Sequence, residues 1–169
     1  MFKRTFLAAS LGLFFAVLSS AEAAVQTYNF SGMLDSGYYV GEHFSGSFSF
    51  NDVALINIGK EWLVVDSLSM NILGNTYTLA NADAPVEVGY INGSFLGLSY
   101  SVSSGEPQFS FIPGLSDVSE AYVAYDTPSG LSGAGDVMYA PVPEPKDWLL
   151  ILAGLGLVGV MVERVKRRV

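Results

Sequence analysis

Alternating apolar and polar residues occupy the central part of this chain, and they constrain its fold more than any other feature. In Phe44–Phe50 the aromatic side chains fall on one face of an extended chain and the serines on the other, because successive side chains of a strand point to opposite faces. Gln108–Phe111 repeats the pattern. No stretch between the two ends of the chain has a sustained 3.6-residue period with helix caps. The pattern therefore predicts half-buried β-strands.

Glycine and asparagine separate these runs at positions typical of hairpins. Gly74-Asn75 divides Trp62–Leu73 from Thr76–Leu79, and Asn92-Gly93 accepts the positive φ angles of a type I′ turn. The other predicted strands share this composition and are Gln26–Leu34, Tyr38–His43 joined to the Phe44 run, Val86–Tyr90, Phe95–Val102, Ala121–Tyr125 and Val137–Ala140. About eight strands in roughly 116 residues predict an all-β fold. We expect a single β-sandwich over residues 24–140, with a jelly roll or a partly closed barrel as alternatives.

Charge is distributed unevenly along the chain. The 169 residues include 8 Lys plus Arg and 16 Asp plus Glu, for a formal net charge of -8. Between Val25 and Ala140, Lys60 is the only base, so this body is strongly acidic and both ends are basic. An acidic body argues against nucleic-acid binding, which depends on Lys and Arg displacing counterions. The absence of cysteine excludes disulfides, thiol catalysis and thiolate metal sites.

The first residues have the order of a secretory signal peptide. Lys3 and Arg4 precede an almost wholly apolar stretch over residues 5–18, and small residues follow it. Ala21 and Ala23 occupy the two small-residue positions of a signal-peptidase site, so we expect cleavage after Ala23. The apolar run is shorter than the roughly 20 residues that span a bilayer, which argues against an uncleaved anchor. We predict a signal peptide over residues 1–23, cleavage by signal peptidase and export.

The other end combines a proline motif, an apolar stretch and a basic tail. The motif is Val142-Pro143-Glu144-Pro145, and uncharged residues follow over 148–162. The bases of the tail are Arg164, Lys166, Arg167 and Arg168. We predict a transmembrane helix over about 148–162, although its rise of about 22 Å is less than the roughly 30 Å hydrocarbon core. Trp148 at the interface and the flanking bases would compensate for the mismatch, with the tail cytoplasmic.

This end of the chain resembles the PEP-CTERM sorting signal of Gram-negative bacteria that make extracellular polysaccharide. The resemblance covers residues 141–169 and depends on the motif, the apolar stretch and the basic tail occurring together. It implies that an exosortase, a membrane enzyme, recognises residues 142–145 and processes the chain near them. It also implies transient retention at the inner membrane and later transfer to the cell surface or matrix. Independently, two prolines around one acid favour an extended backbone that suits a protease groove.

Motifs for catalysis are missing from the sequence. It contains no nucleophile elbow and no glycine-rich phosphate loop. His43 is the only histidine, and we interpret it as a structural or surface residue because Glu42, its neighbour on a strand, points to the opposite face. The acids are sufficient for a calcium site or a glycosidase pair, but no calcium-loop motif is present. We expect no cofactor, with calcium binding as the alternative. We also expect no enzymatic activity.

Tyrosines are the candidates for contact with sugars. Tyr38, Tyr39, Tyr122 and Tyr125 are suited to stacking against sugar rings, although ordinary strand and core packing is the simpler explanation. We predict an exported surface or extracellular-matrix protein with a structural, adhesive or glycan-binding role in exopolysaccharide or biofilm. The alternative is a secreted polysaccharide-modifying hydrolase that uses a carboxylate pair. Ice or surface binding is a third option, but the sequence lacks the regular threonine rows that a flat ice-binding sheet would need.

Overall fold

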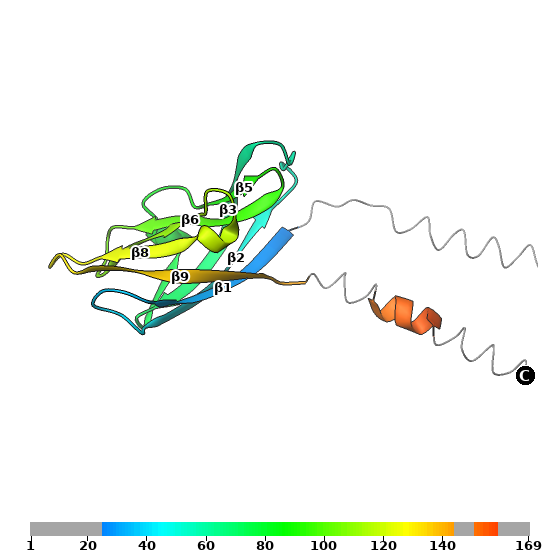
Figure 1. The fold of residues 1–169 in the computed structure, drawn as a ribbon. Helices are drawn as coiled ribbons and strands as arrows, with labels where there is room; N and C mark the ends of the chain where they lie inside the picture. The colour runs from blue at the N-terminus through cyan, green and yellow to red at the C-terminus, as the bar shows by residue number, and fades with distance from the viewer. Residues whose placement is uncertain (1–24, 144–150, 159–169) are drawn as a thin grey trace, which may run out of the picture.

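A computed structural model describes residues 25–143 and 151–158 of the protein. The strands of the described chain are all antiparallel to their neighbours and comprise β1 (Val25–Leu34), β2 (His43–Asn51), β3 (Lys60–Ile72), β4 (Asn75–Thr78), β5 (Glu87–Ile91), β6 (Ser94–Val102), β7 (Gln108–Ile112), β8 (Tyr122–Asp126) and β9 (Ser132–Pro141). Two short 3-10 helices accompany them, η1 (Leu79–Asn81) and η2 (Val118–Glu120). Figure 1 shows these elements gathered into one body.

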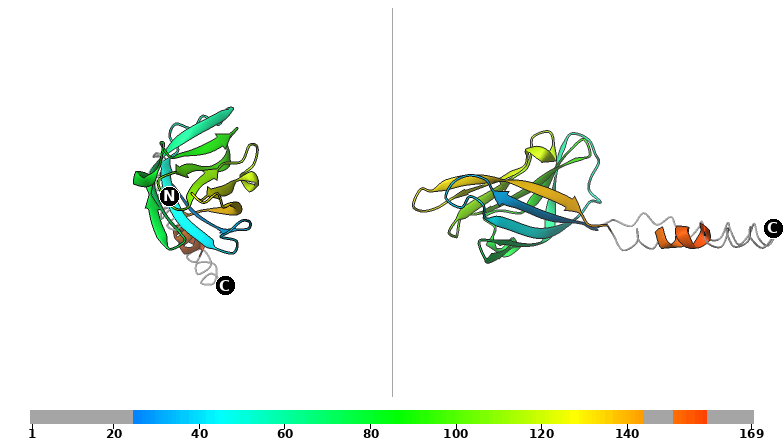
Figure 2. Two further views of the ribbon diagram at one scale, coloured as in Figure 1. Left: turned by 90° about the vertical axis from the view of Figure 1, so that its left-hand side faces the viewer. Right: turned by 60° about the horizontal axis from the view of Figure 1, so that its bottom comes forward.

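Eight of the strands form a closed barrel. The sheet has the order β2-β1-β9-β8-β7-β6-β5-β3-β4, and a further pairing of β2 with β3 closes it. The strand β4 pairs with β3 outside this ring. A view along the long direction of the body shows the strands arranged around a common interior (Figure 2, left).

The closed barrel corrects the predicted β-sandwich, whose two sheets would not be hydrogen-bonded to each other. The long strand β3 pairs with β5 through Lys60–Val64 and with β2 through Val65–Ile72. The pairing of β1 with β9 joins the two ends of the domain. The alternating pattern is the same in a sandwich and in a barrel, because it determines which face of a strand is buried and not which strand is its neighbour.

Both predicted hairpins are confirmed. Asn92 and Gly93 have φ angles of 48° and 82°, the positive values that their turn requires. In the other hairpin the positive φ angles fall at Leu73 and Gly74, so its tip lies one residue earlier than predicted. The hairpins therefore depend on local turn chemistry, which the sequence makes visible.

The predicted boundaries of two strands are wrong. Residues 35–42 connect β1 to β2 as turns and bends rather than extending β2 backwards, and Gly37 and Gly41 within them have φ angles of 81° and 91°. The last strand, β9, begins at Ser132 and not at Val137. Its first half, Ser132–Asp136, has few large apolar residues, so the alternation that identifies other strands is weak there.

Aromatic side chains fill the barrel interior. The ring of Phe48, which is 1% exposed, lies 5.7 Å from that of Tyr28 and 5.9 Å from that of Phe30, centroid to centroid. Glycines on neighbouring strands make room for the rings. Gly46 lies opposite Phe30, and a Cβ atom added to this glycine would collide with the Phe30 ring. The interior is thus packed by side chains of adjacent strands.

The predicted transmembrane helix over about residues 148–162 is also corrected. Helical structure is described for residues 151–158, and within the described parts of the chain no helix has the length and apolar character needed to cross a membrane. The physical reason is length, since 15 residues are fewer than the roughly 20 that a bilayer requires. Several predicted features lie outside the described residues: the signal peptide 1–23 with Ala21 and Ala23, the motif residues Glu144 and Pro145, Trp148, and the tail 163–169.

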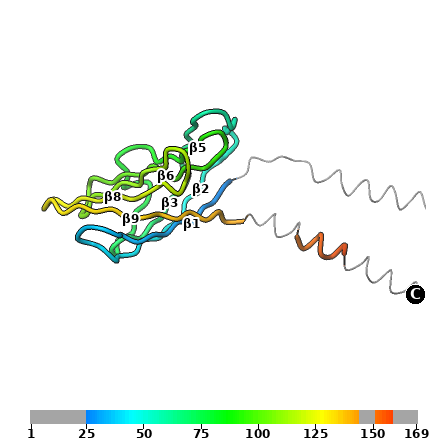
Figure 3. The backbone as a smooth tube through the Cα atoms, viewed as in Figure 1, coloured from blue at the N-terminus to red at the C-terminus, as the bar shows by residue number. Residues whose placement is uncertain are grey.

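The two described ends of the barrel domain lie together. β1 starts and β9 ends at the same end of the barrel, which we call the terminal end (Figure 3). Because the strands are antiparallel, the loops over residues 52–59 and 113–121 also belong to the terminal end. The loops over 35–42, 103–107 and 127–131 belong to the opposite end.

Candidate functional site

Small uncharged polar side chains cover the outer face of β1, β2, β3 and β4. They alternate along each strand with the buried residues of the core, so the period that buries Phe30 and Phe48 turns their neighbours outward. We call this set the hydroxyl face. Its members are Thr27, Asn29, Ser31, Ser45, Ser47, Ser49, Ser67, Ser69, Asn71, Thr76 and Thr78.

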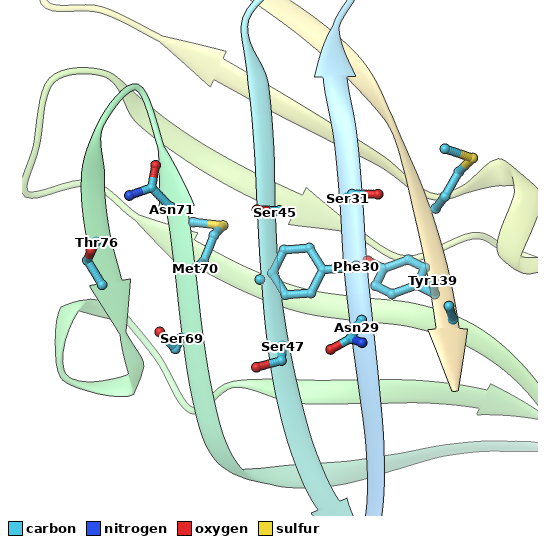
Figure 4. A pocket seen from close by; sticks show the side chains of 13 residues that line it. Asn29, Phe30, Ser31, Ser45, Ser47, Ser69, Met70, Asn71, Thr76 and Tyr139 are labelled. Carbon is cyan, nitrogen blue, oxygen red and sulfur yellow. The ribbon is translucent and has the colours of Figure 1, made fainter. Parts of the chain in front are cut away.

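The strand register aligns the hydroxyl face into rows. Ser47 of β2 lies opposite Asn29 of β1 and opposite Ser69 of β3, and Ser69 in turn lies opposite Thr78 of β4. The next row has the same character and consists of Ser31, Ser45, Asn71 and Thr76. Neighbouring strands are about 4.8 Å apart. Each row therefore presents hydroxyl or amide groups at a regular interval across the strands (Figure 4).

An open groove with a volume of about 840 Å³ runs over the hydroxyl face and the end of β9. Met138 and Ala140 of β9 form its border beside β1. Phe30 and Tyr139 line it from beneath (Figure 4). Burial raises the pKa of Tyr139, whose hydroxyl oxygen accepts a hydrogen bond of 3.1 Å from the backbone N–H of Leu98. The groove thus combines a packed apolar base with a polar, uncharged surface.

Most of the hydroxyl face is available for hydrogen bonding to a ligand. The hydroxyls of Ser49 and Ser67 bond to each other at 2.6 Å, and Thr78 is occupied as the N-cap of η1. Within residues 25–143 the side chains of the remaining members, such as Ser45 and Ser47, form no hydrogen bond to another described residue. Serine and threonine hydroxyls both donate and accept, as does the asparagine amide.

A second groove continues the first toward the opposite end of the barrel. It has a volume of about 560 Å³ and shares Ser31, Ser45, Asn71 and Met138 with the first. Asp35, His43 and Asp136 also line this groove. His43, predicted to be a structural or surface residue, is exposed at the start of β2. Over the described residues, no group of three or more His, Asp or Glu side chains is arranged to hold a metal ion.

The tyrosines proposed as sugar contacts do not form one surface. The ring of Tyr39 lies 5.0 Å from that of Tyr38 and 5.4 Å from that of Tyr125. Tyr125 is buried, and its hydroxyl accepts a hydrogen bond from the Tyr39 N–H and donates one to the Ser36 carbonyl. Tyr122 lies at the other end of β8. Tyr38 is 67% exposed, whereas Tyr39 is partly buried.

Sequence reasoning therefore missed the hydroxyl face as a site. The signal was present in Ser45, Ser47 and Ser49, which fall on one face of the predicted strand. Serine on an outward face is common, however, and only the register shows that Asn29 and Ser69 extend the same row. A site that spans several strands cannot be recognised from one strand.

The proline motif begins where strand pairing ends. The backbone N–H of Val142 donates a hydrogen bond of 2.8 Å to the Thr27 carbonyl, and Val142 and Pro143 are both exposed.

Comparison with protein families, with curated proteins and with solved structures finds no match to this chain.

Proposed function

We propose that the protein is an exported module that binds neutral polysaccharide through the hydroxyl face. The observation that carries this proposal is the set of regular rows of uncharged hydroxyl and amide groups along an open groove. Sugar hydroxyls donate and accept hydrogen bonds, as these side chains do. Because the rows contain no charged residue, they suit a neutral polymer better than an acidic one, which would require basic partners.

The extent of the groove favours a polymer over a single sugar. Individual hydrogen bonds of this kind contribute only about 0.5–1.5 kcal/mol each, so useful affinity requires several sugar units bound along the rows. Met138, which is 71% exposed at the border of the groove, offers an apolar contact for the C–H face of a sugar. Such distributed, moderate binding agrees with an adhesive or structural role in an extracellular matrix.

Calorimetric titration of the full chain with neutral glucans and with an acidic polysaccharide tests the proposal. Replacing Ser45, Ser47 and Ser69 together by alanine should weaken binding of the neutral glucan about tenfold or more, because hydrogen bonds to the sugar are lost. The matched control is Ser110→Ala on β7, which pairs with β6 and β8 on another part of the barrel. Equal binding by the triple variant and the wild type would contradict the proposal.

The hydrolase alternative has one observation in its favour, the presence of Asp35 and Asp136 in the second groove. Paired carboxylates are the usual groups for glycoside hydrolysis. Incubation of the same glucans with the protein would separate the two functions. Release of new reducing ends that is lost in Asp136→Asn would favour hydrolysis, whereas binding without release favours the module.

We also propose that residues 142–145 act as a sorting signal read by an exosortase. Support comes from the exposure of Val142 and Pro143 directly after the last strand, which leaves these two residues of the motif accessible to an enzyme. Replacing Pro143, Glu144 and Pro145 by alanine should leave the protein unprocessed and retained at the inner membrane, as measured by fractionation and by mass. Unchanged release to the surface would contradict this part of the proposal.

A further inference from the structure

The loop over residues 52–59 presents apolar side chains to solvent at the terminal end of the barrel. Val53, Ile56 and Ile58 are 70%, 68% and 73% exposed. Trp62 and Val64, at 41% and 60% exposure, continue this surface along β3. We call these five residues the apolar tip. Single exposed apolar residues are common, but several on one loop and the strand that follows it point to an interaction surface.

Hydrogen bonds hold the loop in this conformation. The Glu61 carboxylate accepts hydrogen bonds from the backbone N–H groups of Ile56, at 2.8 Å, and of Ile58, at 3.2 Å. The side chain of Asn92 accepts another from the Gly59 N–H at 2.9 Å. Several backbone N–H groups of the loop therefore bond within the protein while its isoleucine side chains face solvent. The exposure of these isoleucine side chains is therefore fixed by the hydrogen bonds of the loop.

The loop over residues 113–121, also at the terminal end, has the same combination of a hydrogen-bonded glutamate and an exposed apolar side chain. Leu115 is 79% exposed, and its backbone N–H donates a hydrogen bond of 2.8 Å to the Glu120 carboxylate. Ser116 donates to the same carboxylate through its backbone N–H and its hydroxyl. Bonds from Ser116 and Leu115 lower the pKa of Glu120, which keeps the carboxylate ionised. Two separate loops thus use a glutamate to direct an apolar side chain outward.

We propose that the terminal end of the barrel docks on a lipid bilayer, with the apolar tip inserted at the membrane interface. The position of the chain ends identifies this occupant. The described chain enters β1 and leaves β9 at the terminal end (Figures 1 and 3). In the sequence, the apolar residues 148–162 and the basic tail follow the barrel. The segment between Pro143 and Trp148 reaches at most about 18 Å.

Membrane association of residues 148–162 or of the basic tail would therefore hold the terminal end against the lipid. An apolar tip placed there would be buried in the interface, where transfer of each apolar side chain out of water is favourable. A second copy or a protein partner has no such link to the chain ends. The geometry thus favours the bilayer as the occupant of the tip.

The distribution of charge agrees with this orientation. Lys60 is the only base in residues 25–143, and its ammonium lies 4.9 Å from the centroid of the Trp62 ring. Lysine and tryptophan both combine an apolar body with a polar end and are favoured at membrane interfaces. The acids of the opposite end include Asp35, Glu42, Asp83, Glu106 and Asp126. An anionic bilayer repels that end more than the end that carries Lys60.

The terminal end also carries carboxylates, but these are engaged within the protein. Each accepts a hydrogen bond from a backbone N–H or a side chain, and the set consists of Asp52, Glu61, Asp117 and Glu120. At least one oxygen of each of these carboxylates is therefore bonded within the protein. The apolar tip and the hydroxyl face share no residue, so docking on lipid does not require binding of polysaccharide.

Fluorescence of Trp62 tests the proposal in the full-length chain. The protein contains 2 tryptophans, Trp62 and Trp148, so Trp148→Phe leaves Trp62 as the reporter. The chain is reconstituted with phosphatidylethanolamine and phosphatidylglycerol vesicles whose acyl chains carry bromine, a short-range quencher. We expect quenching of Trp62, and replacing Ile56 and Ile58 by serine should remove roughly half of it or more because the tip loses its apolar insertion. Circular dichroism checks that this surface variant keeps its fold.

A reporter at the opposite end supplies the matched control. The variant Tyr38→Trp, made with Trp62→Phe and Trp148→Phe, places the tryptophan on an exposed site of the 35–42 loop. We expect no quenching of this reporter. Absence of Trp62 quenching, equal quenching of the two reporters, or shielding of Trp62 by self-association without lipid would each overturn the proposal. Because no polysaccharide is present, none of these outcomes bears on the hydroxyl face.

Discussion

The inner and outer faces of β1 and β2 differ in chemistry although both are formed by the same two strands. Inside, Phe30 and Phe48 are 2% and 1% exposed and pack ring against ring. Outside, Ser31 and Ser47 line a groove and form no side-chain hydrogen bond within the described part of the protein. One strand pair can thus supply stability on one side and a binding surface on the other. Substitutions on the two faces should therefore have separable effects.

The largest effect is expected from the inner face. Phe48→Ala should lower the free energy of unfolding by about 3–5 kcal/mol, because it removes a buried ring and leaves a cavity among its aromatic neighbours. Urea unfolding followed by circular dichroism measures the loss. Ser47→Ala, one residue away on the outer face, is the control. A loss for Phe48→Ala no larger than that for Ser47→Ala would contradict the division between the faces.

Alkaline pH should produce an intermediate effect that also arises from the inner face. Burial raises the pKa of Tyr100 from 10.0 to about 12, and its hydroxyl donates a hydrogen bond of 2.8 Å to the Thr78 carbonyl. The folded state thus retains the phenolic proton at a pH where the unfolded chain loses it. This stabilisation is complete below pH 10 and is lost as the pH rises toward 12.

Urea unfolding between pH 9 and pH 12, with tyrosinate absorbance recorded in parallel, measures this dependence. Tyr90 and Tyr139, whose pKa values burial also raises, contribute in the same direction. Tyr100→Phe should therefore make the loss of stability with pH shallower without abolishing it. An unchanged slope in this variant would place the dependence elsewhere.

The smallest effects are expected on the outer face. Ser49→Ala removes the hydrogen bond with Ser67 and should lower the free energy of unfolding by about 1 kcal/mol or less. Ser47→Ala removes no described hydrogen bond and should change it by less than about 0.5 kcal/mol. Thermal and urea unfolding of both variants measures the difference. If Ser47→Ala were the more destabilising, the hydroxyl at position 47 would have a structural role.

Prediction from the sequence succeeded where the controlling contacts are local. Asn92 and Gly93 form the expected turn because the φ angles of a hairpin tip depend on the two residues themselves. The face of β2 that holds Phe44 and Phe48 was predicted correctly, because alternation along one strand determines it. The loop over residues 35–42 was predicted as strand because Tyr38 and Tyr39 favour strands, whereas Gly37 and Gly41 turn the chain there.

The sequence by itself determined that the body is built of β-strands, which side chains face its interior, and that its charge is acidic. Only the tertiary structure decided that the strands close into a barrel, since closure requires β1 to pair with β9 and β2 with β3. The same pairings align the hydroxyl face and bring both chain ends beside the apolar tip. The physical reason is that side-chain alternation acts within one strand, whereas strand neighbours are selected by contacts between residues distant in the chain.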